Sequence, residues 1–109
     1  MHKKEVYRKE YINRINRVID HIEQNLDSPV NFHSLAEIAN FSPFHFHRIF
    51  TVFVGETPNA FISRLRVERA ARLLINDPEI SVSEVAARCG FNSDSVFCRN
   101  FKSHFGMNS

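Results

Sequence analysis

Two arginines occupy matching places in two similar stretches of this 109-residue sequence, Arg48 in the first stretch and Arg99 in the second. A guanidinium group can donate two parallel hydrogen bonds to the major-groove edge of a guanine, and it can also grip a phosphate. The sequence leaves both modes open. A pair of arginines in a repeated frame therefore indicates a surface with two points of contact for duplex DNA.

The repeat that carries these arginines covers residues 35–55 and 85–106. Each copy is typical of a short helix, a tight turn and a second helix marked by phenylalanines, which is the helix-turn-helix pattern. One additional residue in the second turn accounts for a change of register between the copies. The matching positions are Ala36 with Ala86, Phe41 with Phe91, Phe46 with Phe97, Arg48 with Arg99, Phe50 with Phe101, and Gly55 with Gly106.

A rotation of about 100° per residue decides which side chains leave the core on the second helix of each copy. With Phe46 directed inward, the outward or flanking residues are Phe44, His45, His47, Arg48 and Thr51. With Phe97 directed inward, they are Ser95, Cys98, Arg99 and Lys102. Phe44 can pack against a thymine methyl group, the usual apolar contact in the major groove. Because the two outward sets differ, the two halves are expected to read different bases of an asymmetric DNA site.

The elements that must position these faces are all expected to be helices. Apolar residues at three- and four-residue steps predict a first helix over about residues 5–26, and cap signals at Asn31, Ser42, Ser81 and either Asn92 or Ser93 begin later ones. A longer helix over about residues 58–75 follows Thr57-Pro58. The fold class is therefore all-α. The predicted division is a first helix-turn-helix subdomain over residues 1–55, a connector helix in 56–76 and a second subdomain over 77–109.

Composition supports a core and excludes several classes of protein. Hydrophobic residues make up 43% of the chain, and its eleven phenylalanines are expected to fill the core, with Phe44 as the exception. No apolar run is long enough for a transmembrane helix, and the charged beginning is not a secretory signal. The net charge of +2 predicts only modest non-specific attraction to phosphate, so placed contacts must supply much of the binding. Two cysteines fit a reducing cytosol.

Other chemistry is weakly indicated. His45 and His47 lie about 200° apart on a helix, which does not suit a shared zinc ion, so no metal site and no cofactor are expected. Cys98 flanks the outward face and leaves redox control open as a minor alternative. No phosphate-binding glycine loop and no nucleophile motif occurs, so the chain is not expected to be an enzyme. Four arginines of the connector fit phosphate contacts and a solvated, ion-paired face equally well: Arg64, Arg66, Arg69 and Arg72.

The run GFNSDSVFCRNFKSHFG and the matching run FSPFHFHRIFTVFVG are specific, and nearly the whole chain resembles the DNA-binding domain of the AraC/XylS family of bacterial transcription regulators. The resemblance implies seven helices, in two homeodomain-like three-helix units joined by the helix near Pro58 to Ile75. It also implies that the two recognition helices enter successive major grooves on one face of the duplex. The positions that match the family's DNA contacts are Phe44, His47, Arg48, Asp94, Ser95, Val96 and Arg99. An acid at Asp94 suits a cytosine amino group and repels a phosphate.

The resemblance also implies partners and organisation. Double-stranded promoter DNA is the expected partner of a monomeric domain in the cytoplasm, at the nucleoid. The alternative is a protein-interaction module that contacts RNA polymerase or another regulator. The sequence ends at Gly106-Met107-Asn108-Ser109, where the family continues into a closing helix, so the second subdomain is expected to be truncated.

Overall fold

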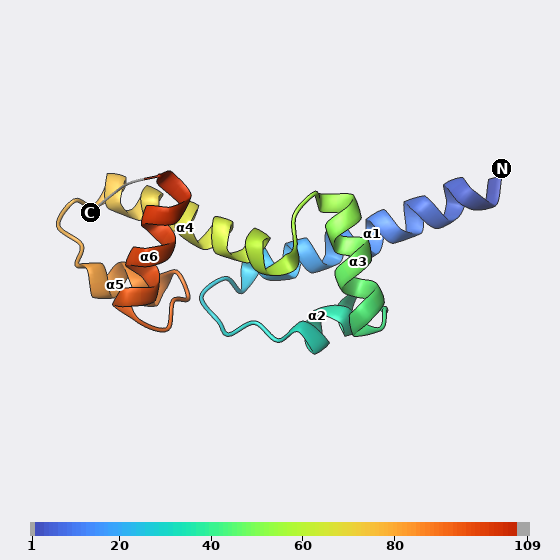
Figure 1. The fold of residues 1–109 in the computed structure, drawn as a ribbon, viewed down its shortest axis with the longest axis horizontal. Coiled ribbons are helices and arrows are strands. Elements are labelled where there is room, and N and C mark those ends of the chain that lie inside the picture. The colour runs from blue at the N-terminus through green and yellow to red at the C-terminus, as the bar shows by residue number, and fades with distance from the viewer. Residues whose placement is uncertain (1, 107–109) are drawn as a thin grey trace. The chain divides into compact units, whose positions relative to one another are not determined.

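The computed structural model describes the backbone of residues 2–106 and the side chains of residues 5–106 (Figure 1). Within this range the chain forms six α-helices and no strand, which confirms the all-α prediction. The predicted truncation concerns the end of the sequence, and residues 107–109 lie outside the described residues. The helices are α1 (His2–Gln24), α2 (Phe32–Ala39), α3 (Pro43–Val54), α4 (Pro58–Asn76), α5 (Val82–Arg88) and α6 (Asp94–Phe105).

The helix starts follow the predicted cap residues. The Asn31 side chain accepts hydrogen bonds from the backbone N–H groups of His33 and Ser34 at 2.9 and 3.3 Å. Ser42 caps α3 and is followed by a proline in the first turn, and Ser81 caps α5. These side-chain oxygens satisfy N–H groups that have no partner inside the helix. Between the two residues proposed for α6, Ser93 is the cap: its Oγ accepts from the Val96 N–H at 3.2 Å.

Both helix-turn-helix turns contain a residue in the left-handed conformation. Asn40 has φ 59° in the first turn and Gly90 has φ 83° in the second. Asparagine is one of the few residues with a side chain that tolerate this region, so the turn keeps its shape without glycine.

The chain divides into two compact units. The first unit contains the residues up to Asn25 together with Val30–Ala60, and the second contains Leu26–Pro29 together with the residues from Phe61 onward. The segment Leu26–Pro29, which follows α1 in sequence, thus packs with the second helix-turn-helix. The three-part domain division drawn from the sequence stays a prediction.

Each unit has its own aromatic core. In the first unit, Phe46 and Phe50 are almost completely buried, with ring centroids 5.6 Å apart, and Val18 of α1 is buried with them. The core of the second unit consists of Ala70, Ile80, Val85, Ala86, Cys89 and Phe97. Three helices thus enclose each core, which holds the outward faces of α3 and α6 in place. No described helix is long and apolar enough to cross a membrane.

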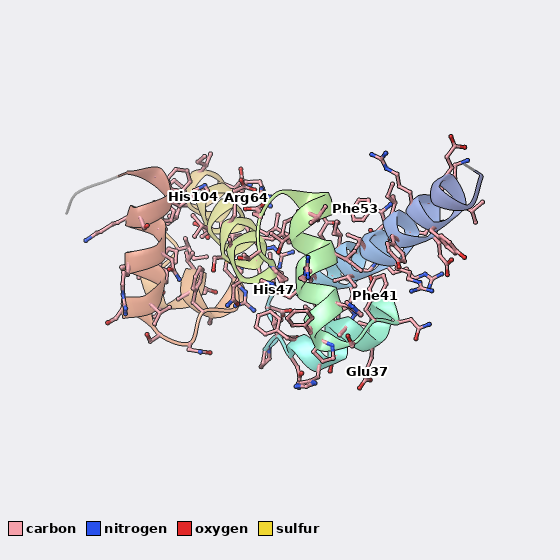
Figure 2. All side chains as sticks on the ribbon, turned by 45° about the vertical axis from the view of Figure 1, so that its right-hand side comes forward. Glu37, Phe41, His47, Phe53, Arg64 and His104 are labelled. Atoms are coloured by element: carbon pink, nitrogen blue, oxygen red, sulfur yellow. The ribbon has the colours of Figure 1, made fainter. Side chains whose placement is uncertain are left out.

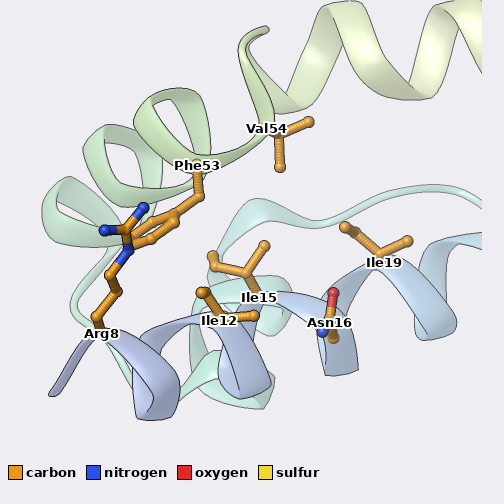
Figure 3. Close-up of a pocket in the computed structure, with 7 residues that line it drawn as sticks. All are labelled: Arg8, Ile12, Ile15, Asn16, Ile19, Phe53 and Val54. Atoms are coloured by element: carbon orange, nitrogen blue, oxygen red, sulfur yellow. The ribbon is translucent and has the colours of Figure 1, made fainter. Parts of the chain in front are cut away.

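The expectation that every phenylalanine except Phe44 belongs to the core is wrong. Phe32 is exposed on α2, Phe53 is 36% exposed on α3 and Phe105 is 44% exposed at the end of α6. Phe53 borders a groove of about 330 Å³ between α1 and α3, which Arg8 also lines (Figure 3). Small three-helix units enclose only their central rows of side chains, so residues of the right periodicity near helix ends stay partly exposed.

Candidate nucleic-acid interface

The outward face of α3 is as open as its periodicity predicts. Phe44 is 69% exposed, and His45, His47 and Arg48 are exposed as well (Figure 2 labels His47). Thr51 is half-buried, and its Oγ1 donates a hydrogen bond to the His47 carbonyl at 2.7 Å. Four of the five predicted residues of this face are therefore exposed, whereas the Thr51 hydroxyl is already used inside its own helix.

Arg48 lies over a neighbouring aromatic ring instead of beside an acid. Its guanidinium carbon is 6.0 Å from the centroid of the Phe44 ring, one helical turn earlier. Arg48 forms no ion pair with any described carboxylate. A weak cation–π contact at an exposed site costs little to break, so the guanidinium is available to a guanine edge or a phosphate.

The outward face of α6 is exposed at Ser95, Arg99 and Lys102. Val96 and Cys98 are half-buried, and Cys98 packs against the core of the second unit. Arg99 and Lys102 make no ion pair with a described carboxylate, so the cationic groups of this face are also available. The two faces resemble each other in one exposed mid-helix arginine and differ in every other exposed group.

Asp94 has a partner inside the second unit that the sequence did not reveal. The Ser83 hydroxyl of α5 donates a hydrogen bond to Asp94 Oδ2 at 2.6 Å, and Asp94 lies in the first turn of α6. A carboxylate there is stabilised by the helix dipole, and the hydrogen bond joins the two helices of the motif. The second carboxylate oxygen still has acceptor capacity for a cytosine amino group.

Replacing Ser83 with alanine is expected to lower the free energy of unfolding by about 0.5–1.5 kcal/mol, because an intramolecular hydrogen bond at an exposed site is lost. Urea unfolding followed by circular dichroism measures this change. Ser103→Ala, an exposed serine on α6, serves as the control. Equal stability of the two variants would show that the hydrogen bond contributes nothing.

The remaining candidate groups carry structural roles. Burial raises the pKa of the Cys89 thiol, against the opposing effect of nearby arginines, so this cysteine behaves as a small core residue. Among the described residues, no group of three histidine, cysteine, aspartate or glutamate side chains could hold a metal ion. Arg64 pairs with Glu68 at 3.2 Å and lies 5.4 Å from the Phe61 ring, while Arg66 donates to two backbone carbonyls. At least two of the four connector arginines are therefore engaged within the protein.

Comparison with known proteins identifies the arrangement. The model of a family described as a helix-turn-helix domain matches residues 35–108. A probable AraC family transcriptional regulator from Rhodopseudomonas palustris has the same fold, with 28% identity, a TM-score of 0.76, and 88% of this chain and 90% of that chain covered. The chain belongs to the AraC-type helix-turn-helix family. The resemblance stated from the sequence is thereby confirmed, and with it a family of DNA-binding transcription regulators.

Three other transcription regulators are similar over most of this chain. The DNA-binding domain of AdpA, solved in complex with a target DNA, is 31% identical with a TM-score of 0.79, and 86% of this chain and 84% of that chain are covered. LumQ of Photobacterium leiognathi, a probable transcriptional regulator, is 32% identical over 88% of this chain and 39% of its own length. The XylDLEGF operon transcriptional activator of Pseudomonas putida is 34% identical over 83% of this chain and 29% of its own length. The chain thus spans less than half the length of these two curated relatives.

One repeat inside this AraC-type domain escaped the sequence analysis. Ile15 and Val18 of α1 are buried against the first helix-turn-helix, as Val67 and Ala70 of α4 are in the second unit. The two helices therefore serve as the first helix of equivalent three-helix units, and Arg14 on α1 stands where Arg66 stands on α4. The signal lay in the spacing of the buried residues and in two arginines that match at an offset of 52, Arg14 with Arg66 and Arg17 with Arg69.

Proposed function

We propose that this chain binds promoter DNA sequence-specifically as the DNA-binding part of a bacterial transcription regulator. The observation that carries the proposal is that α3 and α6 each present an exposed arginine that forms no ion pair with a described carboxylate, on a helix-turn-helix held by its own core. The similarity to the AdpA domain, which was solved with a target DNA, supports the same partner here. A cytoplasmic, nucleoid-associated location follows from that partner.

In this proposal α3 and α6 are the recognition helices and enter successive major grooves on one face of the duplex. Two such grooves lie about 34–36 Å apart, one helical turn of DNA. Arg48 and Arg99 would contact guanine or phosphate, and Phe44 would contact a thymine methyl group. The remaining proposed contacts come from His45, His47 and Thr51 on α3 and from Asp94, Ser95, Val96, Cys98 and Lys102 on α6. Because the two sets differ, the site is asymmetric and one monomer suffices to bind it. The proposed role is binding, without catalysis.

Selection of bound sequences from a random duplex library tests this proposal. The wild-type chain is expected to enrich two informative blocks about one helical turn apart. Arg48→Ala and Arg99→Ala are each expected to erase one block and to weaken binding to the selected duplex by about 1–3 kcal/mol, because each removes one base contact. Arg17→Ala, which removes an exposed charge from α1, is expected to leave both blocks intact.

Enrichment of a single block would show that only one helix reads bases. Unchanged motifs in both variants would contradict the assignment of the two faces. No enrichment in any chain would contradict sequence-specific binding itself.

The alternative is a protein-interaction module for RNA polymerase or another regulator. The comparisons give it no support, but Val52 on α3 is 78% exposed, and exposed apolar residues often mark partner surfaces. Salt separates the two functions, since affinity for DNA falls steeply as salt rises and an apolar protein contact changes little.

A further inference from the structure

Arg66 on α4 makes a contact with a segment that lies far from it in the sequence. Its Nε donates a hydrogen bond to the Leu26 carbonyl at 3.1 Å, and its Nη2 donates to the Ser28 carbonyl at 3.0 Å. Both acceptors belong to the segment between α1 and α2. One guanidinium therefore holds two carbonyls of a loop that is about 40 residues earlier in the chain.

The turn of the second helix-turn-helix closes on the same loop. A Cβ atom at Gly90 would lie 2.3 Å from the Leu26 carbonyl oxygen and 2.9 Å from Arg66 Nε. Both distances are shorter than non-bonded atoms allow, so only glycine admits the loop at this place. Leu26 itself is buried. The loop therefore packs closely against α4 and the turn at Gly90 in the second unit.

The course of the chain gives this contact its importance. The segment Leu26–Pro29 belongs to the second unit, whereas the residues before and after it belong to the first. The chain therefore passes between the units at three places, after Asn25, after Pro29 and after Ala60. If the loop were free, the chain would still connect the two units through α4, which begins in the first unit and continues in the second.

The first unit shows what the equivalent arginine does without such a loop. Arg14 Nη1 donates to the Asn40 carbonyl at 3.4 Å, and its guanidinium carbon lies 4.9 Å from the Phe41 ring. Arg14 thus secures the turn of its own unit. Arg66, in the matching place, donates instead to carbonyls of Leu26 and Ser28. The two matching arginines therefore differ in their partners. The contact with the 26–29 segment is made by Arg66 in the second unit, in addition to the packing that both three-helix units share.

We propose that Arg66 is a positioning residue that fastens the Leu26–Pro29 segment to the second unit and so restricts the movement of the two units relative to each other. The consequence for DNA rests on the proposed function: two heads with restricted movement bind two half-sites at one spacing. Partial burial also lowers the pKa of the Arg66 guanidinium, because the cation is removed from water.

A bivalent binder gains affinity from the effective concentration of its second head, which falls when the connection becomes loose. Loss of the Arg66 contact should therefore weaken binding to the complete site without affecting either half-site alone. The discrimination between correct and incorrect spacing should fall together with it.

The first test needs no DNA. Backbone ¹⁵N relaxation measures the rotational correlation time of each unit in the wild type, in Arg66→Gln and in Arg66→Lys, which keeps the charge but lacks the planar fork. We expect one common correlation time in the wild type and two different, shorter ones in Arg66→Gln. Arg14→Gln, the matched control, removes the equivalent arginine whose contacts stay inside the first unit and should keep the common value. If the amide signals of the second unit lose their dispersion in Arg66→Gln, that unit has unfolded. The correlation times of Arg66→Lys are then compared with those of the wild type.

Two outcomes would overturn the proposal: separate correlation times already in the wild type, or a common value in both Arg66 variants.

The second test uses the selected duplex and a duplex with about five base pairs, half a helical turn, inserted between its blocks. Arg66→Gln is expected to bind the selected duplex about tenfold more weakly, to bind a single block as the wild type does, and to lose about tenfold of the discrimination against the insertion. Unchanged discrimination would refute the role on DNA. Absence of any DNA binding in the wild type would refute the proposed function. It would not affect the conclusion from relaxation about the movement of the two units.

Discussion

Replacing Gly90 with alanine is expected to lower the free energy of unfolding of the second unit by about 2–5 kcal/mol. Its φ of +83° costs an L-residue with a side chain about 1–2 kcal/mol. The new Cβ would also lie 2.3 Å from the Leu26 carbonyl oxygen, and overpacking of this kind costs about a further 1–3 kcal/mol. Because the obstacle is backbone, no side-chain rotation can relieve it. Urea unfolding measures the total.

Gly55→Ala is the matched control for this prediction. Gly55 has φ +90°, but an added Cβ meets no described atom within 4 Å, so only the conformational cost applies. The difference between the two variants isolates the contact between Gly90 and the 26–29 segment. Equal losses of stability would show that this segment leaves the turn in solution, and they would weaken the case for Arg66 at the same time.

The sequence predicted those parts of the fold that local chemistry decides. Asn31, Ser42 and Ser93 cap helices because their side-chain oxygens reach N–H groups two or three residues later, a relation visible in the sequence. Asn40 adopts a left-handed conformation because the turn between two apolar helices requires one. The exposure of Arg48 and Arg99 followed from helical rotation relative to one buried phenylalanine each.

The parts that the sequence did not predict all depend on contacts between distant residues. The connector arginines looked equivalent in the sequence, which did not show that Arg66 donates to the backbone carbonyls of Leu26 and Ser28. Asp94 was assigned to DNA on the resemblance, and its bond to Ser83 became visible only when α5 and α6 were placed together. Periodicity likewise placed Phe105 in the core, because periodicity reports a direction and not whether anything covers that direction.

Replacing Phe46 or Phe97 with alanine is expected to cost about 3–5 kcal/mol in each case, because both rings fill an aromatic core. Phe46 is 1% exposed beside Phe50, and Phe97 is 4% exposed with the Phe91 and Phe101 rings 5.2 and 5.5 Å away. Amide hydrogen exchange shows where the loss of stability is felt. We expect Phe97→Ala to accelerate exchange in α5 and α6, and Phe46→Ala to accelerate it in α2 and α3.

These two variants also show how far the units depend on each other. Each core is enclosed by helices of its own unit, so stability lost in one is expected to reach the other mainly through the 26–29 segment and α4. The slowest amides of the first unit should therefore exchange faster in Phe97→Ala than in the wild type, and addition of Arg66→Gln should remove this effect. Uniform acceleration over all six helices in every variant would contradict separate cores, because the chain would then unfold as one cooperative unit. Acceleration confined to one unit even with Arg66 intact would mean that the segment transmits no stability, so any role of Arg66 would be limited to restricting rigid-body movement.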